Sequence, residues 1–254
     1  MNPSPGEFFV DGLRLAYREQ GCGPLLLILP GNTASSACHS GELDYFGACF
    51  RCVAPDFRGI GRSERLPIWP DEWYQHCAHD MAALLAHLGE QQCIVMGTSG
   101  GAIVALWMAI LYPQSVCAVI ADSTLAAYPP AWLHRVMGMR AERSPGQIHF
   151  WQGAHGDDWA QVVEADTAML RWIAEHGGHI FDDRLGEICC PVLVTASLGD
   201  TMLPDIRTSQ LDLIAAIRDS RLFLAKVGDH PLMWSNPEEF RRAVNAFLAG
   251  VAAG

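Results

Sequence analysis

The sequence predicts an α/β fold: an eight-stranded, mostly parallel, doubly wound sheet, with a small helical cap inserted after the sixth strand. Three observations predict it. Six short runs of continuous apolar residues recur along the chain, as strands covered on both faces require. Helical patterns separate these runs, which is typical of parallel sheets with right-handed crossovers. One segment without a strand pattern, residues 126–184, interrupts the alternation.

The chain begins with a predicted antiparallel hairpin. The segments "EFFV" and "LRLAYREQ" flank a turn at Asp11–Gly12, a dipeptide that favours hairpins. The six apolar runs follow in the order "LLLILP", "RCVAPDF", "CIVMG", "AVIADS", "PVLVTAS" and "RLFLAKV". Together these segments supply the eight strands of the predicted sheet.

Three helices are predicted over residues 71–89, 101–113 and 236–250. The first ends at a glycine and the second at a proline, and both residues are common helix stops. The third begins with Asn236 as its N-cap, followed by a proline and two glutamates in the first turn. These helices alternate with the apolar runs, as a doubly wound sheet requires.

The patterning divides the 254 residues into two regions. Residues 1–125 and 185–254 are expected to form the core domain, and residues 126–184 a helical cap, or lid, over one end of the sheet. The cap segment is rich in tryptophan. Trp132 and Trp151 in the cap, and Trp234 after the last strand, are candidate pocket residues, with a packing role as the open alternative.

Charge and hydropathy exclude several classes of partner. A net charge of −11 disfavours nucleic acid and anionic membranes, and no apolar run reaches the ~18 residues of a membrane span. The N-terminus lacks the basic and apolar blocks of a secretory signal, so the chain is expected to be cytoplasmic. We expect a small-molecule substrate, no cofactor, and no nucleic acid or membrane partner; a homodimer remains open.

The strongest motif is "GTSGG" at residues 97–101, between a predicted strand and a predicted helix. In that context G-x-S-x-G places the serine on a sharp turn, with its hydroxyl exposed above the sheet edge. Side chains would collide in this turn, so glycine is needed at positions 97 and 101. Ser99 is therefore the candidate nucleophile, and the helix N-terminus beside it favours negative charge.

A serine hydroxyl needs a base that takes its proton and an acid that orients the base. His230 in "GDHP" follows the last predicted strand, and Asp200 in "SLGD" follows the strand before it. The chain order Ser99, Asp200, His230 is the order typical of this motif. Asp122 in "VIADST" is the rival acid, because it also follows a strand.

Other polar residues are expected to have structural roles. Asp56 and Arg58 in "PDFRGIGRS" are expected to brace loops, and Asp229 to be a loop residue rather than a second acid. No metal site is predicted, because the polar cluster of the cap lacks the ligand spacing of a known metal motif. That cluster consists of His149, His155, Asp157 and Asp158.

Taken together, these segments resemble the α/β-hydrolase fold superfamily, in its serine-nucleophile branch with a helical cap. The resemblance covers nearly the whole chain, through "LPGN", "APDFRGIGRS", "GTSGG", "PVLVTASLGD", "GDHP" and "NPEEFRRAVNAFL". It implies an oxyanion hole formed by the backbone N–H groups of Asn32 and Gly100. The chain departs from the family at Pro30–Gly31, where His-Gly is usual, but a backbone donor at Asn32 does not need that histidine.

The resemblance implies a cofactor-free serine hydrolase. We expect a carboxylesterase that cleaves small or medium hydrophobic acyl esters through an acyl-enzyme intermediate. Serine at position 99 argues against epoxide hydrolases and haloalkane dehalogenases, which look similar but carry aspartate there. Lactones, thioesters and carbon–carbon bonds remain open as substrates of the same triad. The alternative is a protein that binds a ligand with slow or no turnover.

Overall fold

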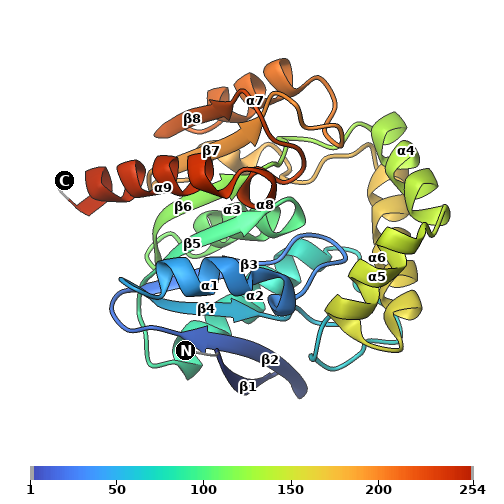
Figure 1. Ribbon diagram of the computed structural model, residues 1–254, viewed down its shortest axis with the longest axis horizontal. Helices are drawn as coiled ribbons and strands as arrows, with labels where there is room; N and C mark the ends of the chain where they lie inside the picture. Colours follow the sequence, from blue (N-terminus) through green and yellow to red (C-terminus); the bar gives the residue numbers. More distant parts are fainter. Residues whose placement is uncertain (1–2, 253–254) are drawn as a thin grey trace.

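Eight strands form one sheet in the computed structural model, which describes residues 3–252. Their order is β1-β2-β4-β3-β5-β6-β7-β8. β1 (Ser4–Val10) and β2 (Leu13–Gln20) form an antiparallel hairpin, and β2 also pairs antiparallel with β4 (Arg51–Pro55). All other strand pairs are parallel. The predicted eight-stranded, mostly parallel sheet is therefore confirmed (Figure 1).

Beyond β4 the sheet continues with five parallel strands, of which the last forms its edge. These strands are β3 (Leu25–Leu29), β5 (Cys93–Thr98), β6 (Val116–Asp122), β7 (Val192–Ser197) and β8 (Ser220–Ala225). Every residue of β3 and β7 is buried, as expected for strands covered by helices on both sides. Parallel strands bring their carboxyl ends to one edge, where loops that carry chemistry gather.

Helices cover both faces of the sheet (Figure 1). One face carries α2 (Trp73–His87), α3 (Gly100–Leu111) and α7 (Ile206–Ala215). The other face carries α1 (Ser40–Phe46) and α9 (Pro237–Ala252). A separate apolar cluster fills each layer. Short helical turns complete the core at η1 (Ser36–His39), η2 (Arg184–Glu187) and α8 (Leu232–Ser235).

The three predicted helices correspond to α2, α3 and α9, and each end lies within two residues of its expected position. Asn236 has the predicted capping role, because its Oδ1 accepts the Glu239 N–H at 3.4 Å. The helices α1 and α7 have no counterpart in the sequence analysis. In α7 only Gln210 and Leu213 are buried, so the helix leaves little apolar periodicity to detect.

Between β6 and β7 the chain forms three further helices. They are α4 (Pro130–Ala141), α5 (Pro145–His155) and α6 (Trp159–Glu175). These helices stand together at one end of the sheet, at the right of Figure 1. They occupy the segment for which the sequence predicts a cap, and we use that word for them below. Within residues 3–252, no helix combines the length and the apolar character that a bilayer crossing demands.

Candidate active site

Ser99 lies on the turn from β5 to α3, in a backbone conformation that few residues adopt. Its φ is 52° and its ψ is −120°, which is a strained combination for a residue with a side chain. The neighbouring glycines are required sterically. A Cβ at Gly97 would collide with the Gly101 carbonyl, and one at Gly101 would collide with the Leu29 carbonyl. The turn therefore has the sharp geometry that the motif predicts.

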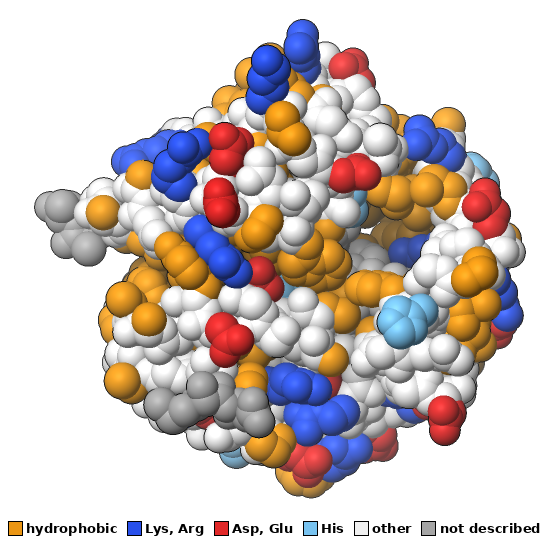
Figure 2. Space-filling model, viewed as in Figure 1, with side chains coloured by type: hydrophobic (Ala, Val, Ile, Leu, Met, Phe, Trp, Pro, Cys, Tyr) orange, Lys and Arg blue, Asp and Glu red, His pale blue; other side chains and the backbone are white. Residues whose placement is uncertain are grey.

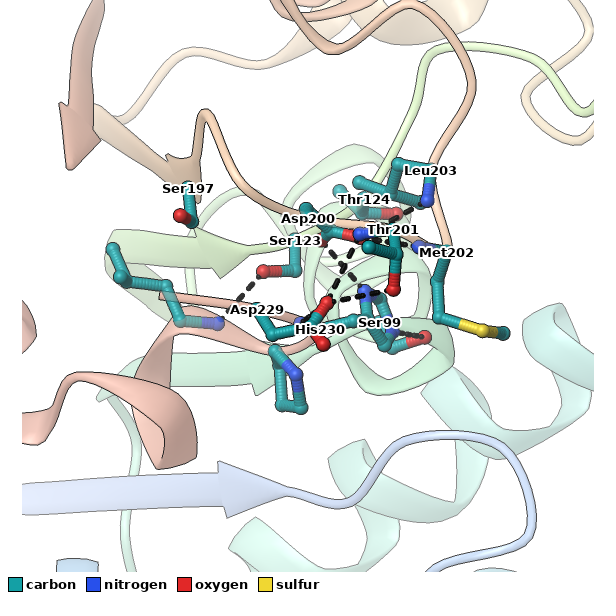
Figure 3. A network of polar contacts seen from close by, with 12 residues as sticks. Ser99, Ser123, Thr124, Ser197, Asp200, Thr201, Met202, Leu203, Asp229 and His230 are labelled. Atoms are coloured by element: carbon teal, nitrogen blue, oxygen red, sulfur yellow. Dashed lines mark hydrogen bonds and ion pairs between the residues drawn. The ribbon is translucent and has the colours of Figure 1, made fainter. Parts of the chain in front are cut away.

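Three side chains from three separate loops form one chain of hydrogen bonds (Figure 3). Ser99 Oγ lies 3.1 Å from His230 Nε2, and His230 Nδ1 lies 2.9 Å from Asp200 Oδ2. A carboxylate at Nδ1 fixes the proton of the neutral imidazole there, which leaves Nε2 free to accept the Ser99 hydroxyl proton. The structure thus brings together the three residues that the sequence singles out.

Backbone N–H groups hold one oxygen of the Asp200 carboxylate, while the other oxygen faces His230. The first of these oxygens, Oδ1, accepts the backbone N–H groups of Met202 and Leu203 at 2.9 and 3.0 Å. Asp229 has a different task, because it accepts the N–H groups of Thr201 and His230 and so joins the two loops. The Thr201 N–H holds the pKa of Asp229 below its usual range. Asp229 is the loop residue that the sequence predicts.

Asp122, the rival acid, is buried beneath the site and directed elsewhere. It accepts the hydroxyls of Thr98 and Thr195 at 3.0 and 2.7 Å, and the Met233 N–H at 3.0 Å. Burial raises its pKa to about 6, against the lowering effect of these hydrogen bonds. The carboxylate joins β5, β6 and β7 to the start of α8, and it therefore braces the loop that carries His230.

The two candidate oxyanion donors lie next to each other beside Ser99. A Cβ at Gly100 would lie 3.1 Å from the Asn32 backbone nitrogen, and one at Gly31 would lie 3.2 Å from Ser99 Cβ. Within residues 3–252, no backbone acceptor takes the N–H of Asn32 or of Gly100. The Gly100 N–H belongs to the first turn of α3, where helical N–H groups have no intrahelical partner. Such free N–H groups can receive a developing negative oxygen.

A pocket of about 430 Å³ lies above Ser99, between the core and the cap. Figure 2 shows a hollow between these two parts, with hydrophobic side chains around it. All three candidate tryptophans, Trp132, Trp151 and Trp234, line the pocket. Most of the remaining side-chain wall is apolar as well, and it includes Val136, Met139, Phe150, Leu170 and Met202.

A pocket-lining arginine and the buried carboxylate that pairs with it were not predicted from the sequence. Arg140 of α4 lines the pocket and pairs with the buried carboxylate of Asp166 in α6. Asp166 also accepts a hydrogen bond from the Asn32 side chain at 3.0 Å. No motif links these three residues. The one available signal is a charge on an apolar helix face, because Asp166 continues the inward row of Val162 and Met169.

Two members of the polar cluster of the cap, His155 and Asp158, hold the cap to the core. His155 Nδ1 accepts the Gly61 N–H at 3.1 Å, so its Nε2 carries the proton and donates to the Thr33 carbonyl at 3.0 Å. Asp158 forms an ion pair with Arg65. In the part of the chain that the structure describes, no three histidine, cysteine or acidic side chains converge as a metal site.

Asp56 and Arg58 are braces, as expected. The Asp56 carboxylate accepts the backbone N–H groups of Ser36 and Arg62 at 2.7 and 2.8 Å. Arg58 forms a buried ion pair with Asp80 of α2. Both contacts fix the loop after β4, which lies beside the loop that carries Asn32.

Comparisons with known proteins agree with this architecture. The family described as "alpha/beta hydrolase fold" matches residues 24–147. A putative carbamate hydrolase RutD from Caulobacter sp. (strain K31) is 26% identical over 96% of this chain and 98% of that protein. A hydrolase from Pseudomonas aeruginosa PA01 superposes with a TM-score of 0.78 at 22% identity, covering 96% of this chain and 98% of that one. A thermophilic esterase from Thermogutta terrifontis gives a TM-score of 0.77 at 22% identity, covering 98% and 99%. This family match and these superpositions show that the chain has the α/β-hydrolase fold, and the relatives that it resembles are hydrolases.

Proposed function

We propose that the chain is a serine hydrolase and, more specifically, a carboxylesterase acting on small or medium hydrophobic acyl esters. The observation that carries the proposal is the hydrogen-bonded chain from Ser99 through His230 to Asp200. Two N–H groups lie beside it that have no backbone acceptor within residues 3–252. Acyl transfer requires this set: a nucleophile, a base, an acid that orients the base, and donors for the oxyanion.

In the proposed reaction Ser99 attacks the ester carbonyl while His230 Nε2 takes the hydroxyl proton. Asp200 stabilises the imidazolium cation, and the N–H groups of Asn32 and Gly100 bind the oxyanion of the tetrahedral intermediate. His230 then protonates the departing alcohol and leaves the acyl group on Ser99. A water molecule that His230 activates attacks the acyl-enzyme and releases the acid.

The pocket supports a hydrophobic acyl group of modest size. Its volume of about 430 Å³ is near the lower end of the range for small-molecule sites, and its wall is mostly apolar. We propose that residues 126–184 act as a lid that excludes water from this pocket. Esters and carbamates both react through a tetrahedral oxyanion, so the carbamate hydrolase relative is compatible with the same chemistry.

The test is hydrolysis of p-nitrophenyl acetate, butyrate and octanoate by the wild type and by Ser99→Ala, followed from the first turnover. We expect steady turnover by the wild type and a loss of around 10⁶-fold in kcat for Ser99→Ala. The chain-length trend measures how much acyl group the pocket accepts. A p-nitrophenyl carbamate, assayed in parallel, separates the ester bond from its nearest alternative.

Other outcomes lead to different conclusions. Activity that survives Ser99→Ala would contradict the assignment of the nucleophile. Steady turnover of the carbamate alone would keep Ser99 and change the bond type. A burst followed by almost no further turnover on every substrate would favour a ligand-binding protein over an enzyme of this kind. A clear preference for charged acyl groups would contradict the proposed apolar specificity.

A further inference from the structure

Asp166 is a carboxylate of the cap that lies against the candidate oxyanion loop. It belongs to α6 and is 1% exposed. Both of its oxygens lie 3.0 Å from Asn32 Nδ2, and Oδ2 also accepts the Thr33 N–H at 3.3 Å. A buried ionised carboxylate is costly unless it is paired and hydrogen-bonded, and Arg140 of α4 supplies a cationic partner. Asp166 therefore connects the cap to two consecutive residues of the loop after β3.

The Asn32 side-chain amide is fixed at both ends. Its Nδ2 donates to Asp166, and its Oδ1 accepts the Tyr74 hydroxyl of α2 at 2.9 Å. Burial raises the pKa of Tyr74 well above its usual range, so this hydroxyl keeps its proton and remains a donor. The amide oxygen thus faces the core and the amide nitrogen faces the cap.

The fixed amide packs on the other candidate donor, Gly100. Any Cβ at position 100 would collide with Asn32 Oδ1, and the Asn32 backbone nitrogen lies 3.1 Å from the same point. The Asn32 amide, the Asn32 N–H and Gly100 therefore form one packed unit. Because Asn32 Oδ1 fills the space at Gly100, a rotation of the Asn32 amide would press on the backbone beside it and displace the Asn32 N–H.

Thr33 gives the loop a second dependence on the cap. Its φ of 57° lies in the left-handed region, which is strained for a β-branched residue. The Thr33 N–H donates to Asp166 of α6, and the Thr33 carbonyl accepts from His155 of α5 at 3.0 Å. Two cap helices thus hold both sides of a strained residue, directly after Asn32.

We propose that Asp166 is a positioning residue for the oxyanion hole. Through Asn32 and Thr33 it sets the place of the Asn32 N–H, so that the hole is complete only when α6 is seated on the core. The inference rests on the proposed function, and Asp166 itself touches no reacting atom. Arg140 has a complementary task, because it neutralises a carboxylate that would otherwise oppose the negative oxygen nearby.

The test separates oxyanion stabilisation from substrate binding. The wild type, Asp166→Ala, Asp166→Asn and Tyr74→Phe are assayed on p-nitrophenyl butyrate and on its thionoester, in which sulfur replaces the carbonyl oxygen. N–H donors bind a compact oxygen anion better than a larger, more diffuse sulfur anion. The ester-to-thionoester ratio of kcat/KM therefore reports the state of the hole.

We expect Asp166→Ala to lower both kcat on the ester and this ratio about 10-fold, since a displaced donor costs less than the ~10²–10³ of a removed one. Asp166→Asn keeps one acceptor for the Asn32 amide, so it should give a smaller fall in the same direction. Tyr74→Phe frees the other end of the amide and should also lower the ratio. Thermal unfolding of each variant is measured alongside.

Thr167→Val is the matched control. Thr167 follows Asp166 on α6 and accepts a hydrogen bond from Arg140 at 3.4 Å. Within residues 3–252, Thr167 forms no hydrogen bond with Asn32. The control should keep the wild-type kcat and the wild-type ratio. It therefore isolates the contact to Asn32 from a general disturbance of α6.

A purely structural role for Asp166 would raise KM or lower Tm and leave the ratio unchanged, and that result would overturn the proposal. If Asp166→Ala does not fold, an unchanged ratio in both Asp166→Asn and Tyr74→Phe would overturn it equally. Failure of the proposed function is recognised separately. In that case the wild type shows no Ser99-dependent turnover, and this inference falls with it.

Discussion

The nucleophile turn and the contacts of the cap are two halves of one site, and the chain encodes them differently. The turn is defined by five consecutive residues, 97–101, in which Gly97 and Gly101 are required because a side chain at either would collide with nearby backbone. The cap contacts join partners that are 134 residues apart at Asn32–Asp166 and 122 apart at Thr33–His155. The steric requirements of the turn allow only glycine at given positions, so a sequence motif reveals them. Polar contacts between distant residues tolerate several residue types, so no motif marks them.

The largest loss of activity among these predictions is expected at the acid of the triad. Asp200→Asn keeps an acceptor for Met202 and Leu203 but presents a donor or a weaker acceptor to His230 Nδ1. The imidazole then loses its preferred tautomer, and we expect kcat to fall about 10⁴-fold with the fold intact. Steady-state kinetics and thermal unfolding measure the two effects.

Asp229→Asn is the control for this change, because Asp229 precedes His230 but its carboxylate bonds, within residues 3–252, only to backbone N–H and hydroxyl groups of the loops. It should cost far less activity than Asp200→Asn. Near-normal activity in Asp200→Asn would instead assign the orienting role to Asp122.

The second effect tests whether the turn is as intolerant as its geometry indicates. Gly97→Ala places a methyl group against the Gly101 carbonyl, which is backbone and cannot move aside. We expect a loss of about 4 kcal/mol or more in the free energy of unfolding. In Gly138→Ala, within α4 of the cap, the new methyl meets no atom of the described residues within 4 Å, and the higher helix propensity of alanine should stabilise the fold by up to about 1 kcal/mol. Urea unfolding measures both variants. Equal changes in the free energy of unfolding at positions 97 and 138 would show that the turn is no less tolerant of a side chain than the cap helix.

The third effect is a pH dependence from Asp122, which ties the turn to the loop of His230. Its pKa is raised to about 6 in the folded chain from an ordinary value of 3.8. Between these values the folded state holds a proton that the unfolded state has lost. The stability that this proton contributes is fully present below pH 3.8 and is lost as the pH rises through about 6.

Asp122→Asn cannot titrate, so it isolates this contribution. The difference in unfolding free energy between the wild type and the variant should shrink by on the order of 2 to 3 kcal/mol from pH 4 to pH 7. Urea unfolding at intervals across this range measures it. Two parallel stability curves would show that Asp122 does not titrate there.

The smallest effect concerns a cap contact remote from the oxyanion loop. Trp132→Phe removes the hydrogen bond from Trp132 Nε1 to the Met202 carbonyl, which links α4 to the loop after β7. We expect about 1 kcal/mol of lost stability and a modest rise in KM, with kcat nearly unchanged. A fall in kcat as large as that expected for Asp166→Ala would mean that cap contacts act on catalysis generally and not through Asn32.

The sheet and the triad were predictable from the sequence because their signals are local. Apolar runs mark the strands, and Ser99 occupies a motif whose partners follow in a fixed order. The choice between Asp200 and Asp122 was left open, since both follow strands. It depends on which carboxylate already has partners, and Asp122 is satisfied by Thr98 and Thr195.

The ion pair of Arg140 and Asp166 beside the pocket could not be predicted, for a different physical reason. Asp166 and Arg140 meet only because α4 and α6 pack side by side. The sequence of either helix alone does not determine the angle of that packing. The contact of Asp166 with Asn32 also requires α6 to lie at one particular distance from the end of β3. A charge on an apolar helix face signals that some partner exists, without identifying it.

The lack of a side chain at Gly100 constrains how the sequence can evolve. Because the Asn32 amide fills the space where a side chain at position 100 would stand, the two positions are not independent. A mutation that enlarges residue 100 is damaging while asparagine occupies position 32, and it becomes tolerable only after a smaller residue has replaced that asparagine. Substitutions at these sites are therefore expected to accumulate in one order, and random libraries that vary position 100 alone should recover glycine almost exclusively.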